Sequence, residues 1–194
     1  MASDPTPPAQ QQLRADAARN RESVLAAATR AFAAADPEPS MREIARSAGV
    51  GVATLYRHFP TREALVDAVY QDQLGRLTTG ANELLEAHPP ARALRLWMNL
   101  FADWLATKHG MTDTLLAMVD TGEISIAHSR RELLAAIAGI LDAGIAAGEI
   151  RGDTSAEDIA DALLGILAVS GKREDQAQRL LDLLMDGLKP RPAG

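Results

Sequence analysis

The segment from Ser40 to Phe59, SMREIARSAGVGVATLYRHF, constrains the fold of this chain most strongly. Ser40 precedes Glu43 by three residues, which is the capping-box pattern that begins a helix. Gly49 then suits the left-handed residue that commonly ends one. A second short helical stretch follows from about residue 51 to residue 58. Two short helices joined by a tight glycine turn predict a helix-turn-helix.

The remainder of the chain is also predicted to be helical. Apolar residues recur at intervals of three and four, and the alternation that is typical of strands is not found. Hydrophobic residues make up 47% of the 194 residues, and Ala and Leu dominate them, which favours helices. Pro37, Pro39 and Pro60 mark breaks between helices. We therefore expect an all-α protein of about nine helices, with a small N-terminal domain and a larger C-terminal one.

The expected domain boundaries follow from composition and helix breaks. Residues 1–16 are expected to form a disordered tail and 17–62 a helix-turn-helix domain. Residues 63–189 should form the C-terminal domain, whose first helix links the two, and 190–194 a second tail. The N-terminus lacks the features of a signal peptide, and no apolar run is long enough to span a membrane. These features favour a cytoplasmic protein with no membrane partner.

Charge is distributed unevenly along the chain. The net charge is −6, which alone argues against a partner that is a polyanion. However, the segment 40–62 contains Arg42, Arg46, Arg57 and Arg62 against one acidic residue, Glu43. A locally basic segment in an acidic chain is typical of a nucleic-acid contact.

The second short helix carries residues suited to DNA. Gly51, Val52 and Ala53 are small enough for close approach to a groove, and a valine or alanine can touch a thymine methyl. Hydroxyl and basic side chains follow, and helix N-termini add N–H donors for phosphate. Exposed residues of these types also occur on helices that bind nothing. The candidate DNA contacts are Ser40, Arg42, Gly51, Val52, Ala53, Thr54, Tyr56, Arg57, His58, Thr61 and Arg62.

The C-terminal half contains an apolar cluster at helical spacing. This cluster could line a pocket for an apolar ligand, although such a stripe is more often plain core. The candidate ligand-binding residues are Trp97, Met98, Phe101, Trp104, Leu105, Leu115, Met118 and Val119. The histidines and carboxylates of residues 109–128 fit no metal-binding spacing. No catalytic motif is found and no cysteine is present, so we expect no cofactor, no metal and no enzymatic activity.

The last two predicted helices are rich in leucine and have polar outer faces. Two such helices from each of two subunits could form a four-helix interface, or one subunit could bury them internally. The candidate interface residues are Ile159, Leu163, Ile166, Leu167, Leu180, Leu181, Leu184 and Leu188.

Residues 20–70 resemble the DNA-binding domain of the tetracycline-repressor (TetR) family of transcriptional regulators. The stretch AGVGVATLYRHFPTREAL carries most of this resemblance. The resemblance implies a homodimer in which three N-terminal helices bind DNA, a fourth links the domains, and the rest binds ligand and partner. It assigns Thr54 and Tyr56 to phosphate, places Val52, Ala53 and Arg57 toward the groove, and includes Arg42, His58 and Arg62 among the contacts. Val52 and Ala53 depart from a polar base-reading pattern.

The function expected from the sequence is therefore that of a DNA-binding transcriptional regulator. We expect a repressor that binds a near-palindromic operator as a homodimer and is released by a small, largely apolar ligand. The alternatives are a constitutive DNA-binding dimer or an activator without an effector, and an all-α enzyme is the least favoured. Operator DNA, a second copy of the chain and a small molecule of unknown identity are the expected partners.

Overall fold

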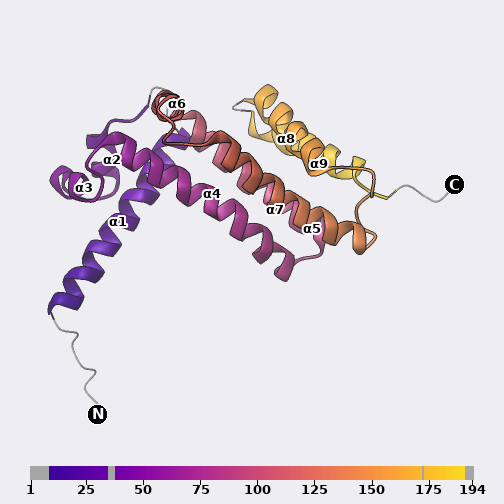
Figure 1. Cartoon of the computed structure of the whole chain (residues 1–194), viewed down its shortest axis with the longest axis horizontal. Coiled ribbons are helices and arrows are strands. Elements are labelled where there is room, and N and C mark those ends of the chain that lie inside the picture. Colours follow the sequence, from indigo (N-terminus) through magenta and orange to yellow (C-terminus); the bar gives the residue numbers. More distant parts are fainter. Residues whose placement is uncertain (1–8, 35–37, 172, 191–194) are drawn as a thin grey trace, which may run out of the picture. The chain divides into compact units, whose positions relative to one another are not determined.

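The computed structural model describes residues 9–34, 38–171 and 173–190, and all regular structure in these ranges is helical. The helices in chain order are α1 (Ala9–Ala34), α2 (Met41–Ser47), α3 (Val52–His58), α4 (Arg62–Ala87), α5 (Pro90–His109), α6 (Thr112–Asp120), α7 (Ile126–Ala146), α8 (Ala156–Ser170) and α9 (Glu174–Gly187) (Figure 1). The nine helices within the described ranges confirm the expected all-α class. None of these helices has the length and apolar character needed to cross a membrane.

The chain divides into two compact units. The first, which we call the head unit, contains residues 1–70 and 106–124, and the second, the body unit, contains 71–105 and 125–194. Helices α4 and α5 each run through a boundary between the units. The expected C-terminal domain is residues 63–189, whereas in the structure α6 packs as part of the head unit.

The head unit is built on contacts among α1, α2 and α3. Val24, Phe32, Ile44 and Leu55 are fully buried at its centre. Helix α1 begins at Ala9, eight residues before the expected start at residue 17. The rest of the predicted N-terminal tail, and residues 191–194 of the predicted C-terminal tail, lie outside the described residues.

The body unit contains an α7–α8–α9 layer in which α8 contacts both other helices. Its interior includes Trp97, whose indole Nε1 donates a hydrogen bond of 2.8 Å to the carbonyl oxygen of Leu77. A capping box begins α8, because Asp158 N donates to Ser155 Oγ and Ser155 N donates to an Asp158 carboxylate oxygen. The three-residue spacing of Ser155 and Asp158 is the same capping-box pattern as that of Ser40 and Glu43.

Candidate nucleic-acid interface

The start of α2 is fixed by the predicted capping box. Glu43 N donates to Ser40 Oγ at 3.3 Å, and Ser40 N donates to Glu43 Oε2 at 2.8 Å. The hydrogen bond from the Ser40 backbone and the one from its hydroxyl lower the pKa of the Glu43 carboxyl. The Ser40 hydroxyl is therefore engaged within the chain, and its contact with DNA stays a prediction.

The turn between α2 and α3 has the geometry that the glycine predicts. Gly49 adopts a φ of 70°, a left-handed conformation that costs glycine little because it has no Cβ. Gly49 N donates to Arg46 O and Val50 N donates to Ala45 O, so carbonyls at the end of α2 are satisfied. This turn sets the direction in which α3 leaves α2.

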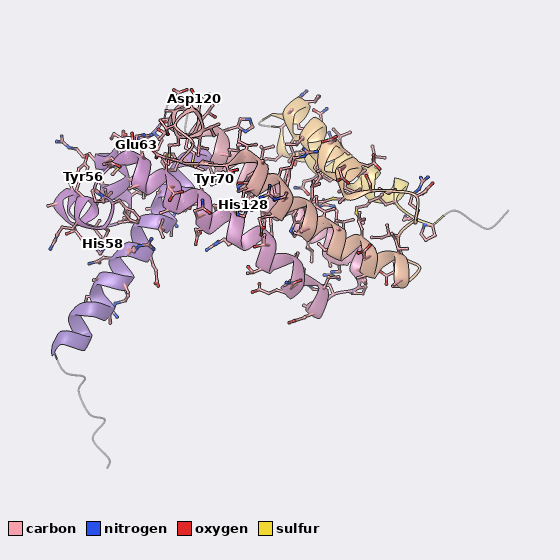
Figure 2. The ribbon with its side chains drawn as sticks, viewed as in Figure 1. Tyr56, His58, Glu63, Tyr70, Asp120 and His128 are labelled. Atoms are coloured by element: carbon pink, nitrogen blue, oxygen red, sulfur yellow. The ribbon has the colours of Figure 1, made fainter. Side chains whose placement is uncertain are left out.

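Helix α3 has one buried and one exposed side. Leu55 and the following Phe59 are buried, and the Arg21 guanidinium of α1 lies 5.2 Å from the centre of the Phe59 ring. The opposite side exposes 45% of Tyr56 and 36% of Val52. Two of the labelled side chains in Figure 2, Tyr56 and His58, lie on this helix. Gly51, Ala53 and Arg57 are exposed too, whereas Thr54 and His58 are half-buried.

The side chain of Arg57 lies back along α3. Its Nη2 donates to Thr54 Oγ1 at 2.9 Å and its Nε to the Ala53 carbonyl oxygen at 3.4 Å. Arg57 and Thr54, both predicted DNA contacts, are therefore hydrogen-bonded to each other on α3. The hydroxyl of Thr54 holds the guanidinium beside the small residues that begin the helix.

The remaining predicted cations differ in their surroundings. Arg42 is exposed on α2, and within the described ranges no side chain pairs with its guanidinium. Thr61 Oγ1 accepts a hydrogen bond from Ala64 N at 3.1 Å, so Thr61 caps the start of α4. Arg62 is engaged by Glu38, Pro39 and Thr114. Its contact with DNA stays a prediction, and local sequence patterns could not reveal partners that lie up to 52 residues away.

The predicted ligand-binding residues lie mostly in the interior. Trp97, Met98, Phe101 and Trp104 are buried on α5, and the rings of Phe101 and Trp97 stack with centroids 5.7 Å apart. Leu105, on the same helix, is half-buried. On α6, Leu115 and Met118 are buried and Val119 is half-buried. Burial of these side chains is consistent with plain core, and their role in ligand binding stays a prediction.

The predicted dimer residues fall into two groups. Ile159, Leu163, Leu181 and Leu188 are buried within the chain, which favours a role in the core of the body unit. Ile166, Leu167, Leu180 and Leu184 are half-buried. The most exposed apolar side chains on α8 and α9 are Leu164, Val169 and Leu183. The predicted set does not include these three, because it follows the stripe that packs inward.

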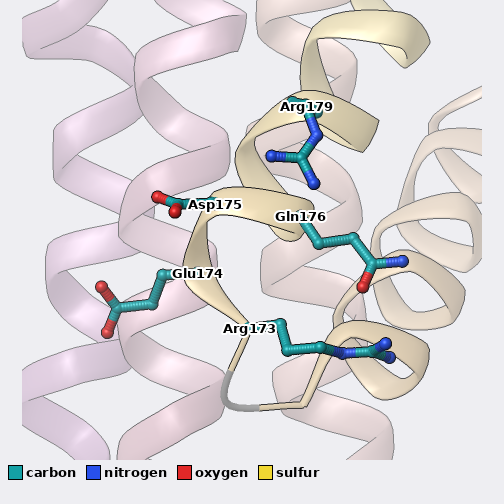
Figure 3. A pocket seen from close by; sticks show the side chains of 5 residues that line it. All are labelled: Arg173, Glu174, Asp175, Gln176 and Arg179. Atoms are coloured by element: carbon teal, nitrogen blue, oxygen red, sulfur yellow. The ribbon is translucent and has the colours of Figure 1, made fainter.

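A polar depression lies at the start of α9. It is lined by Arg173, Glu174, Asp175, Gln176 and Arg179, with the carboxylates on one side of the helix start and Arg173 and Gln176 on the other (Figure 3). Arg173 donates to the carbonyl oxygens of Ser170 and Val169, so it caps the end of α8. None of these residues belongs to the predicted ligand set. No group of three His, Asp or Glu side chains in the described ranges is arranged to hold a metal ion.

Comparisons with known proteins agree with this geometry. Residues 24–69 match the family model described as bacterial regulatory proteins, tetR family, and residues 89–190 match the one described as the C-terminal domain of SbtR-like transcriptional regulators. No curated protein matches the chain.

Two solved structures are similar over most of their length. A TetR transcriptional regulator from Streptomyces coelicolor is 44% identical with a TM-score of 0.81, and the match covers 89% of this chain and 99% of that one. A TetR regulatory protein from Mycobacterium vanbaalenii is 37% identical with a TM-score of 0.72, over 91% and 99% of the two chains. The exposed face of α3, the glycine turn and these matches lead to one conclusion: the chain belongs to the TetR family of DNA-binding transcriptional regulators.

Proposed function

We propose that the protein is a repressor that binds a near-palindromic operator as a homodimer and releases it when a small, largely apolar ligand binds. The observation that supports this most is the exposed side of α3, where Val52, Tyr56 and Arg57 reach solvent while Leu55 and Phe59 anchor the helix. A helix anchored in this way can enter a major groove without losing its packing.

Base reading in the proposal depends on few polar groups. Val52 and Ala53 provide apolar contact, which suits the methyl group of thymine. Arg57 and Arg42 are the proposed hydrogen-bonding readers, because arginine binds both acceptors of a guanine edge. Thr54 and Tyr56 provide hydroxyl groups for phosphate, and the N–H groups at the start of α3 add further donors.

The proposed homodimer is supported by exposed apolar side chains on two adjacent helices. Leu164 and Val169 on α8 and Leu183 on α9 are 39%, 67% and 63% exposed, and α8 and α9 pack against each other. A twofold dimer pairs the same surface from each copy. It would place two copies of α3 about 34–36 Å apart, one turn of DNA, and would require a near-palindromic site.

The proposed apolar effector rests on the composition of α5 and α6. Apart from Thr107, the buried residues of α5 are aromatic, aliphatic or methionine side chains, and those of α6 are Leu115 and Met118. A cavity that opened beside either helix would therefore take a largely apolar molecule. Such a ligand would release DNA only if it bound more tightly to a conformer that cannot hold the operator. A thermal-shift screen with apolar compounds tests this step, and no stabilisation by any of them would favour a constitutive DNA-binding dimer.

The experiment that tests DNA binding directly is selection of bound sites from random double-stranded DNA by the purified full chain. We expect an enriched sequence with two inverted half-sites one helical turn apart. Enrichment of no sequence would contradict the proposal.

A further inference from the structure

The guanidinium of Arg62, at the start of α4, is held by partners from two other segments. Its Nη1 donates to the Pro39 carbonyl oxygen at 2.7 Å, its Nη2 to Glu38 Oε2 at 2.5 Å, and its Nε to Thr114 Oγ1 at 3.2 Å. Every nitrogen of the group therefore donates within the head unit. The side chain is 25% exposed, and its charged end also lies 5.6 Å from the centre of the Phe32 ring.

Glu38 completes the same cluster. Its Oε2 accepts from Arg62 and from Thr114 Oγ1, and its Oε1 accepts from the backbone N of Asp113 in the first turn of α6. The carboxylate thus binds a cation and the N-terminus of a helix together. Glu38, Arg62 and Thr114 form what we call the polar node, which joins the segment before α2, the start of α4 and the start of α6.

A second contact independently fixes the approach to α6. Gly110, between α5 and α6, lies against the backbone of α1, and a Cβ at this position would meet the Phe32 carbonyl oxygen at 1.7 Å. The polar node and this close approach therefore hold the α6 segment to the rest of the head unit at two places.

The node lies directly before the helix-turn-helix. Pro39 is followed by Ser40, whose capping box begins α2, and α2 is joined to α3 by the Gly49 turn. Because the polar node fixes residues 38 and 39, it also fixes the point in the head unit at which α2 begins.

We propose that Arg62 is a positioning residue for DNA recognition and not a phosphate contact. Through Glu38 and Thr114, it holds α2 and α3 in the orientation that fits the operator. If the Arg62 guanidinium turned toward a phosphate, it would lose its hydrogen bonds to three acceptors, and the Glu38 carboxylate would lose its paired cation. This inference rests on the proposed DNA-binding function and assigns position 62 a role that the sequence resemblance does not.

The first test is Glu38→Gln in the full chain, assayed against the operator enriched from random DNA. This change removes a negative charge, so electrostatics alone would leave binding of a polyanion unchanged or tighter. If the polar node positions α2 and α3, Glu38→Gln should instead bind the operator about threefold to tenfold more weakly, as expected for the loss of a charge-assisted hydrogen bond. The matched control is Glu22→Gln, at an exposed position on α1, and it should bind like the wild type.

The second test is Thr114→Val, which removes the hydroxyl without changing charge. We expect operator affinity to fall by about threefold to tenfold while affinity for random DNA changes little. Thr112→Val is the control, since among the described residues the Thr112 hydroxyl bonds only to carbonyl oxygens of the preceding turn. A purely stabilising role for Thr114 would lower the unfolding temperature and leave the ratio of specific to random affinity unchanged, which would overturn the proposal.

The third test separates positioning from phosphate contact at Arg62 itself. For Arg62→Gln, circular dichroism first identifies a temperature at which the variant is folded, and operator affinity is then measured across a salt series. If Arg62 acts through the polar node, we expect weaker binding of the operator and an unchanged slope of log affinity against log salt. A slope smaller by about 0.9 would show a lost phosphate contact and contradict the node.

The failures of the two proposals are distinguishable. If the wild type enriches no DNA sequence, the proposed function fails, and the role of the node in recognition fails with it. If the wild type binds its operator and both Glu38→Gln and Thr114→Val bind it equally well, only the positioning role is overturned.

Discussion

At the scale of single residues, the exposed face of α3 combines anchoring and reading. Leu55 and Phe59 are buried, and Arg57 on the opposite side is held by Thr54. The guanidinium groups of the other two proposed DNA-binding arginines, Arg42 and Arg57, therefore differ in their surroundings. Arg57 is pre-oriented along its helix, whereas Arg42 extends from α2 without a partner among the described residues.

Arg57→Ala tests whether that guanidinium reads a base. We expect operator affinity to fall by about 1–3 kcal/mol, while affinity for random DNA falls much less. Titration of both DNAs at one salt concentration checks this. Arg30→Ala, at an exposed site on α1, is the control. An equal loss of affinity for the operator and for random DNA would show that Arg57 contacts a phosphate and not a base.

The capping box of α2 makes stability depend on pH. The pKa of Glu43 is lowered in the folded state from its ordinary value of 4.5. Its stabilising contribution is therefore present above pH 4.5 and is lost as pH falls through the lower folded pKa. We expect Ser40→Ala to lower the unfolding temperature at pH 7 and to lower it less near pH 3. A difference that stays constant over this range would contradict the role of the ionised carboxylate.

At the scale of helices, the sequence predicted what is local. Ser40 and Glu43 predicted the start of α2, and Gly49 predicted the turn, because each signal lies within one helical turn of its effect. The membership of α6 in the head unit could not be predicted in this way. It depends on pairs such as Glu38 with Thr114, which only the tertiary fold brings together.

The burial of side chains on α8 and α9 also could not be predicted from local sequence patterns. The leucine stripe of α8 and α9 predicted a contact surface, but Leu163 and Leu181 are fully buried within the chain, while Leu164 and Leu183 beside or near them are exposed. Helical spacing identifies which residues share a face. It does not identify which face meets the chain itself and which meets a partner.

Gly110→Ala tests the close approach of the α6 segment to α1. A Cβ there would overlap the Phe32 carbonyl oxygen, so we expect a loss of about 1–3 kcal/mol in the free energy of unfolding. The control is Gly139→Ala on α7, where a Cβ meets nothing within 4 Å. Because alanine is the better helix former, this control should gain up to about 1 kcal/mol. If denaturant unfolding gave similar changes in the free energy of unfolding for both variants, the close approach of Gly110 to α1 would be contradicted.

For the whole molecule, the proposed function requires two copies of the chain on one operator. Leu183→Asp places a charge on the proposed dimer surface, at a side chain that is 63% exposed in one copy. We expect sedimentation to show a weaker dimer while the unfolding temperature changes little. Leu116→Asp on α6, where the leucine is 56% exposed, is the matched control. Equal dimerisation of both variants and the wild type would place the interface elsewhere.

We propose that the α3 surface binds a specific DNA site largely through phosphate contacts and a few base contacts. The most direct measurement is the affinity of the wild-type chain for its enriched site and for a scrambled site, each across a salt series. We expect log affinity to fall linearly with log salt, with a slope of about −0.9 for each phosphate neutralised, and the enriched site to remain preferred throughout. A flat plot, or equal affinity for both sites, would contradict the claim.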